Sequence, residues 1–196
     1  MWENVLFSDE SHFYEGFKKI NSVRRPVGSN RFDPKYLQRT KKHPGYVMVW
    51  GCFSGKGGRG RLNLLERGTR MNAVKYISNL TEYMLPTMEI HDCQYFLQDK
   101  APCHTAKVVK KFFIDNNINI IDWPGNSPDI NPIENLWASL KRQLQNENTS
   151  SVPHVIESLK KIWIKETTHE TCLALAHSMP RRLQNVISAN GEMTKY

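Results

Sequence analysis

The sequence predicts an α/β fold: a mixed five-stranded sheet flanked by helices, with a helical extension at the C-terminal end. Three observations indicate it. Short apolar runs before residue 66 predict an antiparallel meander, helix and strand patterns alternate from residue 72 to 145, and only helical patterns follow from residue 152. With 39% hydrophobic and 23% charged residues, the 196-residue chain suits a single domain, residues 1–196, with a sizeable core.

The first strands are predicted from short apolar runs. Residues 5–8 form one, and residues 13–17 and 22–25 can continue as hairpin strands. The clearest strand is residues 46–53, rich in β-branched and aromatic side chains, and residues 61–66 form another. Between them, residues 55–60 match the G-x-G-x-x-G pattern of dinucleotide loops. Because such a loop must lead into a helix, we interpret these glycines as a hairpin turn and expect no nucleotide cofactor.

Helices and strands then alternate. The predicted elements are helices at residues 72–85, 104–116 and 132–145, and strands at residues 94–98 and 118–123. Pro86 is expected to end the first of these helices, and Pro124-Gly125 to stop the last strand. This order fits a ribonuclease-H-like sheet, in which the first strand is central and carries a carboxylate.

Composition restricts the partners of the chain. Lys and Arg exceed Asp and Glu by 8, which favours a polyanion such as nucleic acid, although a merely basic soluble protein has the same balance. The four cysteines have no zinc-site spacing, and no apolar run is long enough to span a membrane. No signal peptide is recognisable, so an intracellular protein is expected.

Three carboxylates stand at the ends of recognisable segments. Asp9 follows the first strand, Asp99 follows the strand at residues 94–98, and Glu134 opens the third helix, 34 residues after Asp99. Separate rigid elements can deliver carboxylates to one metal site. Taken alone, each also has a local explanation, because Asp is common at turns and Asn131-Pro132-Ile133-Glu134 matches a capping box. His104 is either a general base or a helix-start residue.

The strings around these carboxylates are more specific. They are Phe7-Ser8-Asp9-Glu10-Ser11, residues 47–54 (VMVWGCFS), residues 98–106 (QDKAPCHTA) and residues 127–137 (SPDINPIENLW). Together, in this order and with the 34-residue gap, they resemble the DDE transposases of the Tc/mariner superfamily, most closely the Tc-one-like branch. The resemblance runs from Trp2 to Tyr196.

The resemblance implies a function. Such enzymes use two Mg²⁺ or Mn²⁺ ions to cut DNA at transposon ends and join the freed 3′-hydroxyl to target DNA, and they act in the nucleus. It implies that Asp9, Asp99 and Glu134 are catalytic residues and metal ligands. The basic segment from residue 24 to 42 occupies the place of the clamp loop of the family, which suggests a homodimer contact. The alternative interpretation of this segment is a solvated basic loop. The DNA-binding candidates are Arg24, Arg25, Arg31, Lys35, Arg39, Lys41, Lys42 and Lys141.

The chain departs from the family pattern twice. The family usually has Asn directly after the second Asp, where this chain has Lys100. Lys100 is a candidate activity modifier, because its ammonium group can compete with Mg²⁺. The alternative is that strand alternation directs the side chain away from Asp99. The family also has helix-turn-helix modules before the catalytic domain, and we expect residues 1–196 to contain none. An impaired or co-opted relic that binds DNA or a protein partner without cleavage is therefore the alternative function, and another nuclease of this fold is a third.

Overall fold

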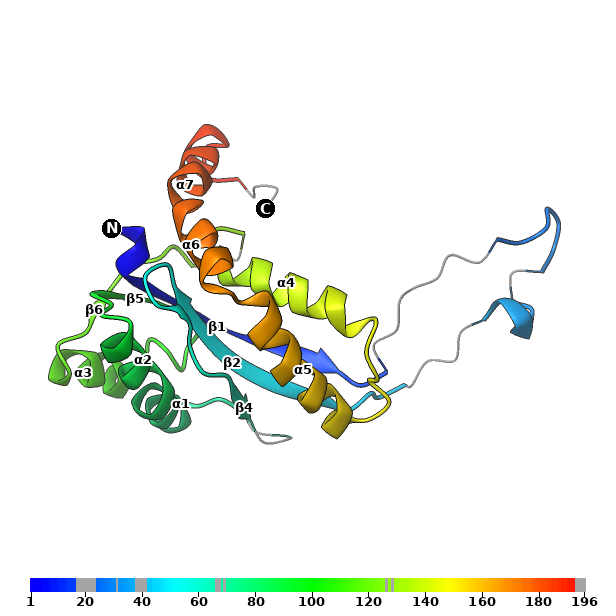
Figure 1. The fold of residues 1–196 in the computed structure, drawn as a ribbon, viewed down its shortest axis with the longest axis horizontal. Helices are drawn as coiled ribbons and strands as arrows, with labels where there is room; N and C mark the ends of the chain where they lie inside the picture. Colours follow the sequence, from blue (N-terminus) through cyan, green and yellow to red (C-terminus); the bar gives the residue numbers. More distant parts are fainter. Residues whose placement is uncertain are drawn as a thin grey trace.

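The computed structural model describes residues 1–16, 24–30, 32–37, 42–65, 68, 70–125, 127 and 129–192. Its centre is a six-stranded sheet in the order β3-β2-β1-β5-β6, with β4 also paired to β2 (Figure 1). The strands are β1 (Val5–Tyr14), β2 (Tyr46–Ser54), β3 (Gly58–Arg59), β4 (Asn63–Leu65), β5 (Tyr95–Leu97) and β6 (Asn119–Ile120). Because β1 is antiparallel to β2 and parallel to β5, the prediction of a mixed sheet with a central first strand is confirmed.

The sheet has one strand more than predicted. The extra strand is β3, two residues of the glycine-rich segment that pair with Phe53 and Ser54 at the end of β2. This segment therefore folds back on the sheet, as a hairpin does, and no helix follows it. The prediction of a hairpin turn at the glycines is confirmed in this form.

β1 is longer than predicted. Its expected end was residue 8, but it runs for ten residues to Tyr14, so Asp9 lies inside the strand. The partner strand explains the difference, because β2 pairs with β1 continuously from Leu6 to Tyr14 and supplies ladder hydrogen bonds to its polar residues. The predicted hairpin strand at residues 22–25 falls partly outside the described residues, and Arg24 and Arg25 are not in a strand.

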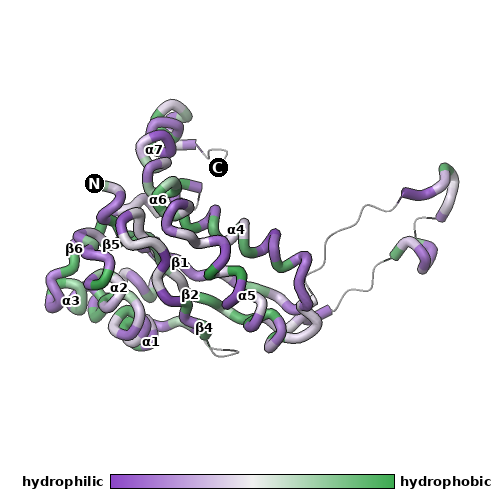
Figure 2. The backbone as a smooth tube through the Cα atoms, viewed as in Figure 1, coloured by the Kyte–Doolittle hydropathy of each residue, from purple (hydrophilic) through white to green (hydrophobic). Residues whose placement is uncertain are grey.

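Helices cover both faces of the sheet (Figure 1). One apolar core joins Leu6, Trp50 and Phe96 to the α1–α3 side, and the other joins Phe7, Phe53 and Trp137 to the α4–α6 side. The helices are α1 (Ala73–Asn79), the π-helical turn η3 (Leu80–Met84), α2 (Leu85–Ile90), α3 (Lys107–Asp115), α4 (Ile133–Leu144), α5 (Val152–Glu166), α6 (His169–His177) and α7 (Met179–Ser188). Figure 2 shows apolar and polar residues alternating along them, as amphipathic helices require.

Two features of the helices bear on the predictions. The helix expected to end at Pro86 continues to Ile90: the π-helical turn η3 leads directly into α2, and Pro86 is the second residue of α2. The C-terminal extension consists of α5, α6 and α7, as predicted. Within the described residues, no helix is long and apolar enough to cross a membrane.

The connection from β1 to β2 leaves the body of the molecule. Residues 24–30 and 32–37 lie away from the sheet (Figure 1) and include the short 3₁₀ helix η2 (Pro34–Tyr36). Another 3₁₀ helix, η1 (Trp2–Asn4), leads into β1. The described part of this connection is therefore an excursion from the sheet.

Candidate active site

Asp9 and Asp99 come from neighbouring parallel strands. Phe7 of β1 pairs with Leu97 of β5, and each aspartate lies two residues further along its own chain segment. The hydroxyl of Ser8 donates a hydrogen bond to the Leu97 carbonyl at 3.0 Å, which ties the two segments together just before the aspartates. The register of the sheet therefore brings two residues far apart in sequence to the same end of adjacent strands.

Glu134 reaches the same region from α4. The side-chain amide of Asn131 donates to the carbonyl of Ser8 at 3.2 Å, so the segment before α4 is attached to β1 beside Asp9. The capping-box alternative is not formed. α4 begins at Ile133 without a side-chain cap hydrogen bond, which makes Glu134 the second helical residue and leaves its carboxylate without a partner among the described residues.

Gly51 allows α4 to approach the sheet. It pairs with Asp9 across the β1–β2 ladder. An added Cβ at Gly51 would lie 2.6 Å from Cη2 of Trp137, far inside ordinary contact distance. Trp137 is fully buried and stacks on Trp163 with ring centres 5.5 Å apart, so the indole has little room to move. The missing side chain at residue 51 thus sets how closely the helix carrying Glu134 packs beside Asp9.

The three carboxylates line one cavity of about 530 Å³. Trp123, Asn131 and the loop around Gly125 complete its wall. The sequence-predicted trio is therefore brought together by β1, the segment after β5, and α4. A cavity of this size with several acidic groups can admit a hydrated cation and a phosphate group.

Asp9 is the carboxyl group of this cavity whose ionisation the structure opposes most clearly. Burial, together with the nearby carboxylates of Glu10, Glu134 and Asp99, raises the pKa of Asp9 to about 8. Each of these effects penalises another negative charge in the same space. A bound cation would remove that penalty, and carboxylate oxygens are the donors that Mg²⁺ and Mn²⁺ prefer.

Asp99 faces a different partner. Its Oδ1 lies 2.5 Å from Nδ1 of His104 and accepts a hydrogen bond from the Ala101 N–H. Nε2 of His104 is 3.3 Å from a carboxylate oxygen of Glu10, in ion-pair range but without hydrogen-bond alignment. In this arrangement no three His, Cys, Asp or Glu side chains of the described residues converge on one metal position. A metal site would therefore require the carboxylates to move closer together, and Oδ1 of Asp99 is already engaged by His104 and Ala101.

His104 carries a positive charge at neutral pH. Burial alone would lower its pKa, but the hydrogen bond that its ring donates to Asp99 and the nearby negative charge of Glu10 outweigh burial and raise the pKa to about 10. Its ring also stacks on Tyr76, with centres 3.9 Å apart. A protonated imidazole cannot accept a proton, so the structure does not support His104 as a general base.

A model of the DDE superfamily endonuclease domain matches residues 4–166. The chain belongs to the DDE endonuclease superfamily. Within it, this endonuclease domain is 40% identical to the Tcb2 transposase of Caenorhabditis briggsae and 39% identical to the Tc1 transposase of Caenorhabditis elegans, covering all of this chain and 71% of each relative. It is therefore a Tc/mariner transposase domain. The crystal structure of the Mos1 mariner paired-end complex with Mn has the same fold, with a TM-score of 0.84 at 21% identity over 100% of this chain and 58% of that one.

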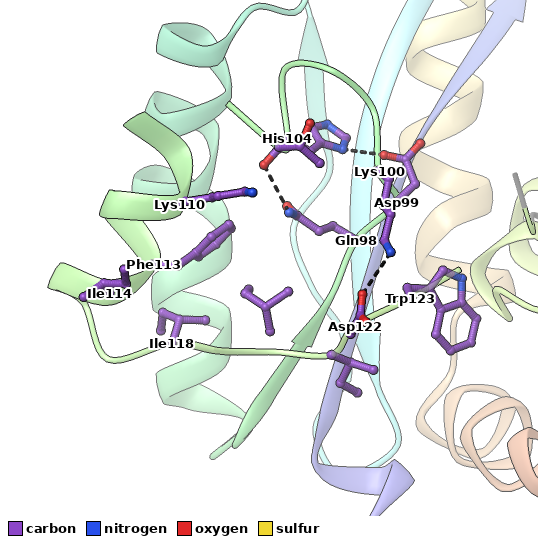
Figure 3. Close-up of a pocket in the computed structure, with 13 residues that line it drawn as sticks. Gln98, Asp99, Lys100, His104, Lys110, Phe113, Ile114, Ile118, Asp122 and Trp123 are labelled. Carbon is purple, nitrogen blue, oxygen red and sulfur yellow. Dashed lines mark hydrogen bonds and ion pairs between the residues drawn. The ribbon is translucent and has the colours of Figure 1, made fainter. Parts of the chain in front are cut away.

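Lys100 points away from the carboxylate of Asp99 in this endonuclease domain. Its Nζ lies 2.9 Å from Oδ1 of Asp122, and Figure 3 shows the two side chains leaving neighbouring positions in opposite directions. Lys100 and Asp122 line a second cavity of about 570 Å³ between α3 and β6. The ammonium group of Lys100 is thus turned towards Asp122 beyond the end of β5, although Lys100 also lines the cavity of the three carboxylates.

The basic residues proposed for DNA lie apart from the cavity. Arg24, Arg25 and Lys42 are exposed in the connection between β1 and β2. Lys35 pairs with Asp33 at 2.9 Å. Lys141 lies on α4, with its ammonium 5.7 Å from the centre of the Phe13 ring. Arg31, Arg39 and Lys41 fall outside the described residues. The structure thus leaves the DNA-binding prediction untested and brings none of the described candidates into the cavity wall.

Sequence reasoning missed Glu10 and Asn131. Glu10 contacts His104 on the opposite face of β1 from Asp9, a placement that strand alternation indicates once β1 is known to continue past Asp9. Asn131 was read as a helix cap, and its oxygen does accept a long hydrogen bond of 3.4 Å from the Ile133 N–H. Its link to Ser8 spans 123 residues, and no local pattern reports such a contact.

Proposed function

We propose that this domain cleaves DNA phosphodiester bonds and transfers the resulting 3′-hydroxyl to target DNA, with divalent metal ions held by Asp9, Asp99 and Glu134. The observation that carries the proposal is the convergence of these carboxylates on one cavity, with the pKa of Asp9 raised by burial and by its acidic neighbours. The relatives named above are transposases, and the Mos1 complex contains Mn. These facts support the same chemistry here.

The proposed role of each residue follows from its position. When bound, Mg²⁺ or Mn²⁺ ions stabilise negative charge on the phosphate and lower the pKa of an attacking hydroxyl. Asp9 is fixed by the central strand, so it supplies the least mobile ligand. Asp99 would join the metal from its position beside His104, and His104 would orient Asp99 while its other ring nitrogen stays beside Glu10. Glu134 closes the set from α4.

Two ions are proposed, because three carboxylates from separate elements can bridge a pair, and phosphoryl transfer uses such pairs to stabilise the attacking and leaving oxygens. We also propose that the basic segment between β1 and β2 contacts DNA phosphates or a second copy of the chain. Its exposed Arg24, Arg25 and Lys42 support the electrostatic part of this proposal.

The test is nicking of supercoiled plasmid by the purified chain. Wild type is expected to nick in the presence of Mg²⁺ or Mn²⁺ and to stop when EDTA is added, and Asp99→Asn should reduce the rate by at least about a hundredfold. Asp92→Asn is the matched control, because Asp92 is exposed and does not line the cavity. Nicking that survives EDTA or the Asp99 substitution would contradict the proposal and favour a non-catalytic relative that only binds DNA.

A further inference from the structure

Arg182 is a buried arginine on an otherwise exposed helix. It is 3% exposed, and α7 buries only this residue and Met179. α7 also lies outside residues 4–166, the part of the chain that matches the endonuclease family. Buried arginines are uncommon unless their guanidinium groups are fully engaged, so the partners of Arg182 indicate what it does.

Its guanidinium group connects α7 to the beginning of α4. Nη2 donates to Oδ1 of Asn135 at 2.6 Å, and Nη1 donates to the main-chain carbonyl of Asp129 at 3.3 Å. Nε donates to the hydroxyl of Ser178 at 2.8 Å, which fixes the side chain at its base. A planar, forked donor can hold two acceptors in a set geometry, which an ammonium group cannot do.

These acceptors flank Glu134 in the chain. Asn135 is its immediate neighbour in the first turn of α4, and Asp129 belongs to the segment that leads into this turn. The carboxylate of Glu134 has no hydrogen-bond partner among the described residues, so its position depends on where the helical turn is held. Asn131 attaches the turn to β1 through Ser8. Arg182 attaches it to α7 from a separate element.

We propose that Arg182 is a positioning residue for Glu134: through Asn135 and the Asp129 carbonyl it fixes the first turn of α4, and so sets the affinity of the carboxylate cavity for divalent metal. The inference rests on the proposed function, because it concerns the same metal site. Groups that orient a ligand without touching the metal typically contribute about 10–100-fold to metal affinity. α7 is thereby a component of the site and not only a cover for the core.

The experiment measures Mn²⁺ binding to the full 196-residue chain by electron paramagnetic resonance of free Mn²⁺, with no DNA present. Arg182→Lys retains the charge but loses the fork, and Asn135→Ala removes the acceptor while leaving Arg182 in place. Each is expected to raise the Kd for Mn²⁺ about tenfold. The double variant should bind no more weakly than either single variant, because both changes break one connection.

Leu183→Ala is the control for loss of stability. Leu183 is the next residue of α7 and packs against the apolar core, but its side chain has no part in the hydrogen bonds from Arg182 to Asn135 and to the Asp129 carbonyl. The Leu183→Ala substitution should lower the melting temperature and leave the Kd for Mn²⁺ unchanged. Wild-type affinity in both Arg182→Lys and Asn135→Ala would overturn the inference, as would an equal loss in Leu183→Ala. If wild type itself binds no Mn²⁺, the proposed metal site fails and this inference fails with it.

Discussion

Gly51→Ala is the substitution that tests most directly how the helix carrying Glu134 is placed. The new Cβ would lie 2.6 Å from Cη2 and 3.3 Å from Cζ2 of Trp137, and 3.1 Å from Cδ2 of Leu62. Ordinary contact begins near 3.4 Å, so the indole would have to retreat by most of an ångström. Trp163 and Phe13 pack around it. We expect the free energy of unfolding to fall by about 1–3 kcal/mol, the usual range for overpacking a core.

The assay is urea unfolding at constant pH, combined with Mn²⁺ titration of the folded protein. Trp137→Phe provides the matched background, because phenylalanine lacks the outer indole ring that the new methyl group would strike. In that background Gly51→Ala should cost at least about 1 kcal/mol less than in wild type. The reasoning is refuted if the alanine costs the same in both backgrounds, or if Gly51→Ala is as stable as wild type and binds Mn²⁺ equally well.

Three further predictions concern charge. Without metal, Asp9→Asn should raise the free energy of unfolding by roughly 1–3 kcal/mol, because the raised pKa of Asp9 shows that the fold opposes its ionisation. The same substitution should abolish the thermal stabilisation by Mn²⁺. A destabilised variant that still gains stability from Mn²⁺ would contradict this prediction. Lys100→Asn should change metal-dependent nicking less than about twofold, because the exposed pair with Asp122 already holds the ammonium away; a tenfold gain would show that Lys100 suppresses activity. Burial, and to a smaller extent His169, lowers the pKa of His91 in the folded protein. The contribution of His91 to stability is therefore present above its ordinary pKa of 6.5, and it is lost as the pH falls from 6.5 towards the lowered pKa of the folded state. Urea unfolding at pH 7.5 and 5.5 should therefore show a smaller loss in His91→Gln than in wild type, and equal losses would refute the assignment.

The sequence predicted the structure correctly where a local pattern of residues is sufficient to determine how the segment packs. Tyr46–Ser54 is a strand in the structure because its β-branched and aromatic residues pack on both faces of the sheet. Asp9, Asp99 and Glu134 line one cavity, and their role as metal ligands stays a prediction. The extent of β1 was not predictable in this way, because polar residues such as Asp9 and His12 remain in the strand only through pairing with β2.

The remaining contacts of the site link residues far apart in the chain. His104 joins Asp99 to Glu10, and Arg182 joins Asn135 across 47 residues. Local propensity contains no information about such pairs, since the fold alone determines which side chains meet. The direction of Lys100 was undecidable for a similar reason: its partner, Asp122, follows β6 and reaches it only when that strand has joined the sheet.

The central place of β1 has a consequence for how the molecule folds. Its antiparallel neighbour, β2, follows in the chain before any α-helix, whereas its parallel neighbour, β5, is 90 residues away at the Val5–Tyr95 pair. The β1–β2 hairpin can therefore form early, while closure of the longer loop comes late. Until then, β1 presents an unpaired edge on which another chain could assemble. The acidic pair Asp9-Glu10 lies in the middle of that edge, and charges within an open strand oppose aggregation. We therefore expect Asp9, a proposed metal ligand of the folded protein, and Glu10 to oppose aggregation of the half-formed sheet.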